Sequence, residues 1–223
     1  MDDSFSFAVQ DGLSVSGRLL VPPGARACYV LAHGAGAGME HPFMQAAAAE
    51  LGALGIATLR YQFPYMNRRK RRTDPPALCQ ATVRAAVAEA ARRAPALPLF
   101  AGGRSFGGRM TSQAQALKPL PNVCGLAFVG FPLHPPKQPS DTRAEHLLKV
   151  HIPMLFLQGS RDEFAELNLL QPLVHRLKDK ATLCLLENAD HSFHVPARGT
   201  VTNGQINTDM LNALSAWIDT VTN

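Results

Sequence analysis

Ser105 stands between two pairs of glycines in GGRSFGG (residues 102–108), directly after the apolar run PALPLFA. Glycine weakens helices, so its clustering where a helix is about to begin calls for another explanation. The central five residues match G-x-S-x-G, the pattern of a nucleophile elbow, in which a serine occupies a strained turn between a strand and a helix. A serine hydroxyl exposed on such a turn can attack an acyl carbonyl once a base takes its proton. We therefore predict that Ser105 is a nucleophile.

The base is expected among the eight histidines of the chain. His191, in ENADHSFH, follows the last apolar run, where an open α/β sheet places its ligand-binding edge. His194 is the runner-up. His33 is interpreted as a structural residue that orients the loop after an earlier strand. Ordinary surface or core roles are expected for the remaining five, which are His41, His134, His146, His151 and His175.

The acid that orients the histidine is predicted to be Asp162 in LQGSRDEF, because it follows the penultimate apolar run at the same sheet edge. Asp190 adjoins His191, but adjacent loop residues generally point apart, and Asp190 is better suited to tightening its own loop. Glu163 is a weaker fallback. The resulting chain order, nucleophile then acid then histidine, is the one that α/β-hydrolases use.

A negative charge developing on a substrate oxygen requires fixed N–H donors. The segment LAHGAGAGM (residues 31–39) ends a buried run and supplies small residues whose amides can turn inward. We assign the two donors to the backbone N–H groups of Ala35 and Phe106. A glycine-rich phosphate loop is the alternative interpretation of this segment, but the Lys-Ser/Thr ending of a P-loop and the dinucleotide spacing are both missing.

Arg60, Arg104 and Arg109 all lie near the predicted site in the sequence. They are candidates for binding an anionic group on the substrate. We favour the competing interpretation, in which the five N–H donors of each arginine brace loops through backbone carbonyls or internal carboxylates.

The elements that must position these residues follow a regular pattern. Two alternating runs flank Asp11-Gly12, a dipeptide that β-hairpins favour. Six continuous apolar runs follow, typical of strands buried on both faces, at 27–32, 56–61, 97–101, 123–129, 152–157 and 181–186. Helical patterns lie between or after them at 42–55, 73–94 (with Asp74 as a possible cap), 166–179 (with Pro172 as a kink or start) and 206–221. This alternation predicts a mainly parallel sheet between layers of helices, in a single domain over residues 1–223.

The composition of the chain indicates its cellular location and the classes of partner to expect. The four cysteines have neither zinc nor redox spacing, no leader-like segment is evident, and no run reaches the roughly 18 apolar residues of a membrane span. We expect a cytoplasmic protein without a membrane partner. The basic run NRRKRR (residues 67–72) accounts for much of the net charge of +5. Without an aromatic framework it is interpreted as a solvated loop, and no nucleic-acid partner is expected.

Together with RYQFPYM and FPLHPP, these motifs give a chain that resembles the α/β-hydrolase superfamily over nearly its whole length. Within it, the chain is similar to small, lidless proteins akin to dienelactone hydrolases and to the testis-expressed hydrolase-like proteins. The resemblance implies an eight-stranded, mostly parallel sheet with helices on both faces, an antiparallel N-terminal hairpin and no lid.

The resemblance also implies hydrolysis of esters or thioesters of small, soluble acyl substrates through an acyl-enzyme, with no metal or organic cofactor. Dienelactone hydrolases use a cysteine where this chain has Ser105, so their substrate is not carried over. The alternative is a non-catalytic binding or scaffold protein on the same fold, as a related chromatin-complex subunit suggests. The oligomeric state stays open.

Overall fold

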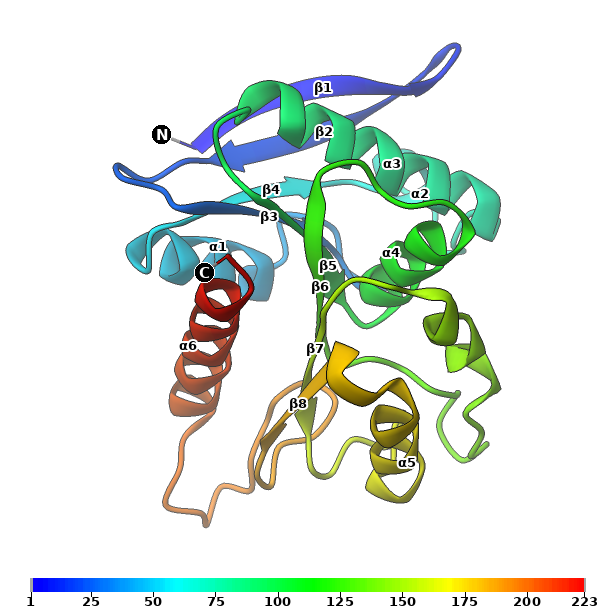
Figure 1. Ribbon diagram of the computed structural model, residues 1–223, viewed down its shortest axis with the longest axis vertical. Coiled ribbons are helices and arrows are strands. Elements are labelled where there is room, and N and C mark those ends of the chain that lie inside the picture. Colours follow the sequence, from blue (N-terminus) through cyan, green and yellow to red (C-terminus); the bar gives the residue numbers. More distant parts are fainter. Residues whose placement is uncertain (1, 223) are drawn as a thin grey trace.

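The computed structural model describes residues 2–222 and contains a twisted eight-stranded sheet (Figure 1). Its strands are β1 (Asp2–Gln10), β2 (Leu13–Leu20), β3 (Ala27–Ala32), β4 (Ile56–Tyr61), β5 (Leu99–Arg104), β6 (Val123–Val129), β7 (Met154–Gly159) and β8 (Ala181–Leu186). Their spatial order is β1-β2-β4-β3-β5-β6-β7-β8. Pairing is antiparallel for β1–β2 and β2–β4 and parallel for all the others. The predicted fold class is confirmed, including the hairpin that turns at Asp11-Gly12.

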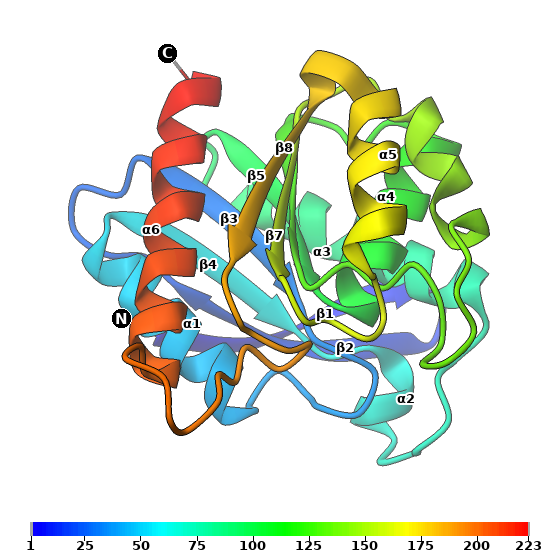
Figure 2. The same cartoon turned by 90° about the horizontal axis from the view of Figure 1, so that it is seen from below.

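Helices cover both faces of this sheet (Figures 1 and 2). One face carries α1 (Pro42–Ala53) and α6 (Asn203–Thr222). The other carries α3 (Pro76–Arg93), α4 (Phe106–Leu117) and α5 (Leu167–Leu177), together with the 3₁₀ helix η1 (Thr142–Lys149). The short α2 (Pro64–Asn67) follows β4, and the 3₁₀ helix η2 (Lys178–Lys180) precedes β8.

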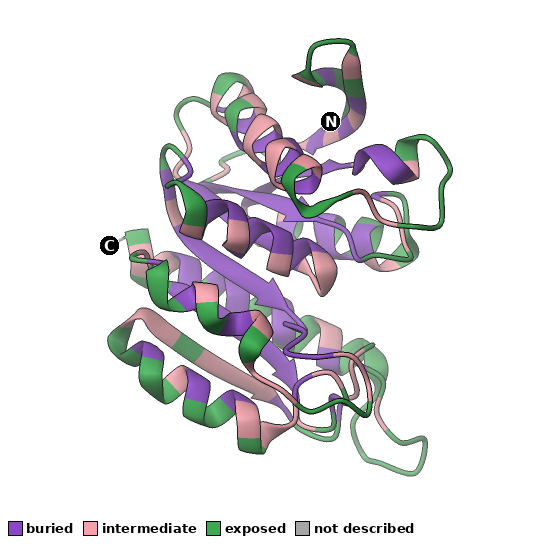
Figure 3. Cartoon of the chain, turned by 90° about the vertical axis from the view of Figure 1, so that its right-hand side faces the viewer, coloured by how far each residue is buried: buried purple, intermediate pink, exposed green. Residues whose placement is uncertain are grey.

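The continuous apolar runs form the centre of the fold because helices exclude water from both of their faces. Every residue of β3, β4 and β7 is buried. Two apolar clusters result, one beneath α3, α4 and α5 and one beneath α1 and α6. Figure 3 shows the burial concentrated in the central strands, whereas β8, at the free edge of the sheet, is mostly half-buried. A rigid sheet of this kind fixes the positions of the loops at its ends.

Several helix boundaries differ from the sequence prediction. Helix α3 is capped by Pro75 rather than Asp74, whose side chain instead accepts a hydrogen bond from Arg68. Helix α5 begins at Leu167 and continues through Pro172, so the proline does not mark its start. The short α2 and η1 carry too few residues to show a helical period, and neither was predicted.

The connection between β6 and β7, residues 130–153, is where a lid would be inserted. Its only helical piece is η1, which packs on α4 and α5, so the connection contains no helical lid. Within residues 2–222, no helix is both long enough and apolar enough to cross a membrane.

Candidate active site

Ser105 lies between the last residue of β5 and the first of α4, with φ +47° and ψ −112°. Non-glycine residues rarely adopt such angles, which cost on the order of 1–3 kcal/mol and persist only when the surroundings enforce them. Two backbone hydrogen bonds do so here: Ser105 N donates to the Val129 carbonyl at 2.9 Å, and Arg109 N donates to the Ser105 carbonyl at 3.1 Å. The serine is therefore held in the strained turn expected of a nucleophile elbow.

Two glycines of the motif show why glycine clusters at the start of this helix. A Cβ atom on Gly103 would lie 2.3 Å from the Ala32 carbonyl oxygen, and one on Gly107 would lie 2.6 Å from the His33 carbonyl oxygen. Both distances are far inside van der Waals contact. The elbow thus presses β5 and α4 against the end of β3, and only glycine fits at these positions.

The parallel strands β5, β7 and β8 end at the same edge of the sheet, and the loops that follow them bring three predicted residues together. The Ser105 Oγ atom lies 2.9 Å from His191 Nε2, and His191 Nδ1 lies 2.7 Å from Asp162 Oδ2. With its proton on Nδ1, the imidazole donates to the carboxylate and presents the Nε2 lone pair to the serine hydroxyl. This geometry suits proton transfer from Ser105 to His191.

Asp162 is fixed by more than the histidine. Its side chain is fully buried, Oδ1 accepts the Phe164 N–H at 2.8 Å, and Oδ2 also accepts a hydrogen bond from the Gln158 side chain. Asp190 instead accepts the N–H groups of Ser192 (2.7 Å) and His194 (2.9 Å) within its own turn. The fallback residue Glu163 is exposed, and within residues 2–222 it takes no part in the hydrogen bonds that hold Asp162 and His191.

Three residues around His191 were missed in the sequence. Gln158 accepts the buried Phe131 N–H at 2.8 Å with its carbonyl oxygen, so its amide nitrogen must face Asp162. The Phe164 ring lies 4.2 Å from the imidazole, tilted by 31°. On Gly130, at φ +68°, a Cβ would lie 3.5 Å from two imidazole atoms. A lone amide in an apolar strand was a usable signal for Gln158, whereas nothing in the sequence marked Phe164.

His33 is buried beneath the loop of residues 34–37. Its Nδ1–H donates to the Gly34 carbonyl at 2.7 Å and its Nε2 accepts the Phe63 N–H at 3.0 Å, which defines a neutral tautomer. Burial lowers the pKa of His33 to about 4, so it stays neutral at ordinary pH. The Tyr65 hydroxyl holds the next carbonyl, that of Ala35, at 2.9 Å.

These contacts orient the first of the two predicted oxyanion donors, the Ala35 N–H. In a planar trans peptide the N–H points opposite to the preceding C=O, so a Gly34 carbonyl turned toward His33 directs the Ala35 N–H away from it. Ala35 lines the same pocket as Ser105. Phe106 is the first residue of α4, where N–H groups have no partner inside the helix and point outward from its N-terminus.

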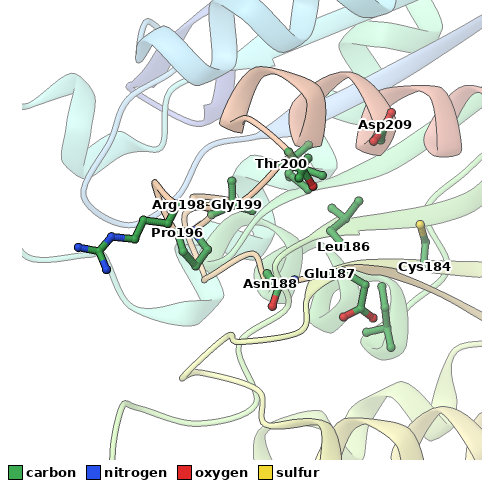
Figure 4. Close-up of a pocket in the computed structure, with 13 residues that line it drawn as sticks. Cys184, Leu186, Glu187, Asn188, Pro196, Arg198, Gly199, Thr200 and Asp209 are labelled. Carbon is green, nitrogen blue, oxygen red and sulfur yellow. The ribbon is translucent and has the colours of Figure 1, made fainter.

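The pocket in front of Ser105 has a volume of about 570 Å³. It is lined by Gly34, Ala35, Gly36, Ala37, His41, Arg104, Ser105, Phe164, His191, Ser192 and His194. A second hollow, of about 630 Å³, lies between β8, the loop of residues 195–201 and α6 (Figure 4). Its lining includes none of Ser105, Asp162 and His191, so the smaller pocket is the one in which these groups could act.

The side chains of the three candidate arginines have different surroundings in the structure. Arg60 is 2% exposed and donates to the Met39 carbonyl at 3.1 Å, which fits the bracing interpretation. Arg109 lies over the Phe106 ring, 5.8 Å from its centre, and is not among the residues that line the pocket. Arg104 does line it.

A family profile described as alpha/beta hydrolase domain matches residues 25–219. The chain belongs to this family. The match spans every element from β3 through most of α6, and so includes the whole candidate site.

Solved structures with the same fold include a dienelactone hydrolase from Anabaena variabilis, which is 22% identical over 98% of this chain and 96% of that one, with a TM-score of 0.77. An α/β serine hydrolase without a lid from Xanthomonas campestris is 18% identical over 97% of this chain and 94% of that one (TM-score 0.74). A serine hydrolase homologue from Coxiella burnetii is also 18% identical, over 95% and 97% of the two chains (TM-score 0.74). At these identities the likeness establishes the fold.

Proposed function

We propose that this protein is a serine hydrolase that cleaves carboxylic esters or thioesters of small acyl substrates. The observation that carries the proposal is the continuous hydrogen-bonded chain from the strained Ser105 through His191 to the buried Asp162, at 2.9 and 2.7 Å. A structural serine needs neither a strained backbone nor a histidine whose other nitrogen is fixed by a buried carboxylate.

In the proposed reaction, Ser105 Oγ attacks the acyl carbonyl while His191 Nε2 takes the hydroxyl proton. Asp162 holds the imidazole in the required tautomer and stabilises the imidazolium that forms. The N–H groups of Phe106 and Ala35 bind the negatively charged oxygen of the tetrahedral intermediate, an interaction that strengthens as the charge develops. His191 then protonates the leaving alkoxide or thiolate, which leaves an acyl group on Ser105.

Deacylation repeats these steps with water. His191 takes a proton from the water, the resulting hydroxide attacks the acyl carbonyl, and the proton passes to Ser105 Oγ as the acid departs. The site favours short acyl groups, because no lid closes over the pocket to enclose the length of a long acyl chain. We therefore expect short activated esters to be hydrolysed and long-chain lipids to be poor substrates.

The test is a comparison of wild-type protein and Ser105→Ala on 4-nitrophenyl acetate and butyrate, with circular dichroism to verify the fold of both. Wild-type turnover that is lost in folded Ser105→Ala supports the proposal. Undiminished turnover in Ser105→Ala removes the mechanism. A folded wild type that is inactive on short esters of every class would instead favour the binding or scaffold alternative.

A further inference from the structure

Arg104 is the residue immediately before the candidate nucleophile, and its side chain lies in the wall of the same pocket. Its guanidinium carbon is 4.5 Å from the centre of the Phe43 ring, at the start of α1, and 5.9 Å from that of Phe193, in the loop after His191. Aromatic faces support a guanidinium group without consuming its N–H donors. The head group of Arg104 is thus held in place while its donors remain usable.

In the part of the chain that the structure describes, these donors have no protein acceptor. Within residues 2–222, no hydrogen bond or ion pair joins the Arg104 side chain to another residue. Arg60 and Arg26, in contrast, donate to backbone or carboxylate oxygens. Burial lowers the pKa of Arg104, and the negative charges of Asp190 and Asp162 partly oppose this shift. Within residues 2–222, none of the Arg104 nitrogens is a buried atom without a partner, so its donors are open to the pocket, where a ligand can supply the acceptor.

The charged residues of the pocket also favour an acceptor supplied by an anionic ligand. None of its lining residues is an aspartate or glutamate, and Arg104 is the one lysine or arginine among them. The two carboxylates that act on Arg104 lie outside this lining: Asp162 accepts from three donors, and Asp190 accepts two backbone N–H groups at Oδ1 and places Oδ2 3.8 Å from His194 Nδ1. The lining of the space in front of Ser105 therefore carries one permanent positive charge and no carboxylate.

We propose that Arg104 binds a carboxylate on the substrate, so that the preferred substrates are esters or thioesters of short dicarboxylic acids with one acid group free. This inference rests on the proposed hydrolase function. One permanent positive charge matches one carboxylate, and the planar guanidinium can bind its two oxygens side by side. Because Arg104 and Ser105 line one pocket of about 570 Å³, a short spacer can join the free carboxylate to the reacting carbonyl. Bound in this way, the carboxylate also orients the carbonyl toward Ser105.

The first experiment compares the 4-nitrophenyl half-ester of adipic acid with 4-nitrophenyl hexanoate, which has a methyl group in place of the free carboxylate. Wild type should prefer the half-ester in kcat/KM by about 10- to 100-fold, the value of charge-assisted hydrogen bonds. In Arg104→Gln this ratio should fall to about one. The matched control is Arg109→Gln, an arginine near the elbow but outside the pocket, which should keep the wild-type ratio. An equal kcat/KM for both esters in wild type, or a preference that survives in Arg104→Gln, would overturn the inference.

A second experiment separates this inference from the hydrolase proposal. Monomethyl adipate is titrated into Ser105→Ala protein by calorimetry, which requires no turnover. Binding should weaken about 10- to 100-fold on adding Arg104→Gln, whereas dimethyl adipate should bind the two proteins equally. If wild-type protein hydrolyses neither ester but monomethyl adipate still binds in a way that depends on Arg104, the hydrolase proposal alone is refuted. Binding that does not depend on Arg104 would refute the carboxylate site alone.

Discussion

Replacing Asp162 with asparagine should reverse the tautomer of His191. The carboxylate meets three donors: Phe164 N–H at Oδ1, and His191 and Gln158 at Oδ2. An asparagine has only one acceptor oxygen, and the backbone N–H of Phe164 cannot move to avoid a conflict, whereas the Gln158 amide can shift. The asparagine oxygen should therefore face Phe164 and its NH₂ should face His191. The imidazole must then accept at Nδ1 and carry its proton on Nε2, which faces Ser105.

In that tautomer His191 cannot take the serine proton. The loss in kcat for a wrong histidine tautomer is about 10⁴-fold, or about 5–6 kcal/mol of activation free energy. The assay is kcat on 4-nitrophenyl acetate, with the fold verified by circular dichroism. The control is Asp190→Asn, because the Asp190 oxygen that accepts the Ser192 and His194 N–H groups can be replaced by an amide oxygen. We expect kcat of the control to stay close to wild type.

Wild-type kcat in folded Asp162→Asn would refute this reasoning. So would a larger loss in Asp190→Asn than in Asp162→Asn, because it would make Asp190 the acid.

Three further predictions concern residues around the site. Gln158→Leu strands the Phe131 N–H and removes a donor from Asp162, so urea unfolding should show a loss of about 2–5 kcal/mol and kcat should fall up to about 100-fold; Gln115→Leu, which strands only the Leu120 N–H, should lower stability with unchanged kcat. The pKa of His33, lowered from 6.5 to about 4, means that only the unfolded chain binds a proton there between those pH values; the free energy of unfolding should thus rise with pH, and His33→Gln should reduce this slope by up to about 1.4 kcal/mol per pH unit, so an unchanged slope would contradict the assignment. Gly107→Ala places a Cβ 2.6 Å from the His33 carbonyl oxygen, so unfolding should cost about 1–3 kcal/mol less and kcat/KM should drop; a fully active variant would show that the elbow tolerates a side chain.

The succession of strands along the chain and the edge at which they end could be predicted from the sequence because both depend on patterns several residues long. Each continuous apolar run became a strand, fully or largely buried except for β8 at the sheet edge, and polar residues that follow β5, β7 and β8 met at one edge. The choice of Asp162 over Asp190 as the partner of His191 followed from the same geometry, since a neighbouring strand end can reach the far side of the imidazole and an adjacent residue cannot.

What could not be predicted depends on contacts between residues far apart in the chain. Phe164 packs on His191 and Gln158 bridges Phe131 to Asp162, yet neither residue belongs to a local pattern that names its partner. The arginines show the same limit. Their spacing was equally suggestive for all three, and only the packed structure separates Arg60, bound to a carbonyl, from Arg104, which faces the pocket. The prediction that Asp74 caps α3 was wrong for a further reason. The Asp74 carboxylate accepts a hydrogen bond from the Arg68 guanidinium, which competes with the backbone N–H groups of a helix terminus.

The most direct test of the central claim is covalent labelling with a fluorophosphonate, followed by mass spectrometry of the peptide that contains Ser105. Such a reagent reacts with a serine that is activated by a histidine and held beside oxyanion donors, and a merely structural serine does not provide that environment. Wild-type protein should carry one phosphonyl group per chain, on Ser105, and none should be found in Ser105→Ala or after denaturation. A folded wild-type protein that remains unlabelled, or that is labelled on another serine, would contradict the central claim.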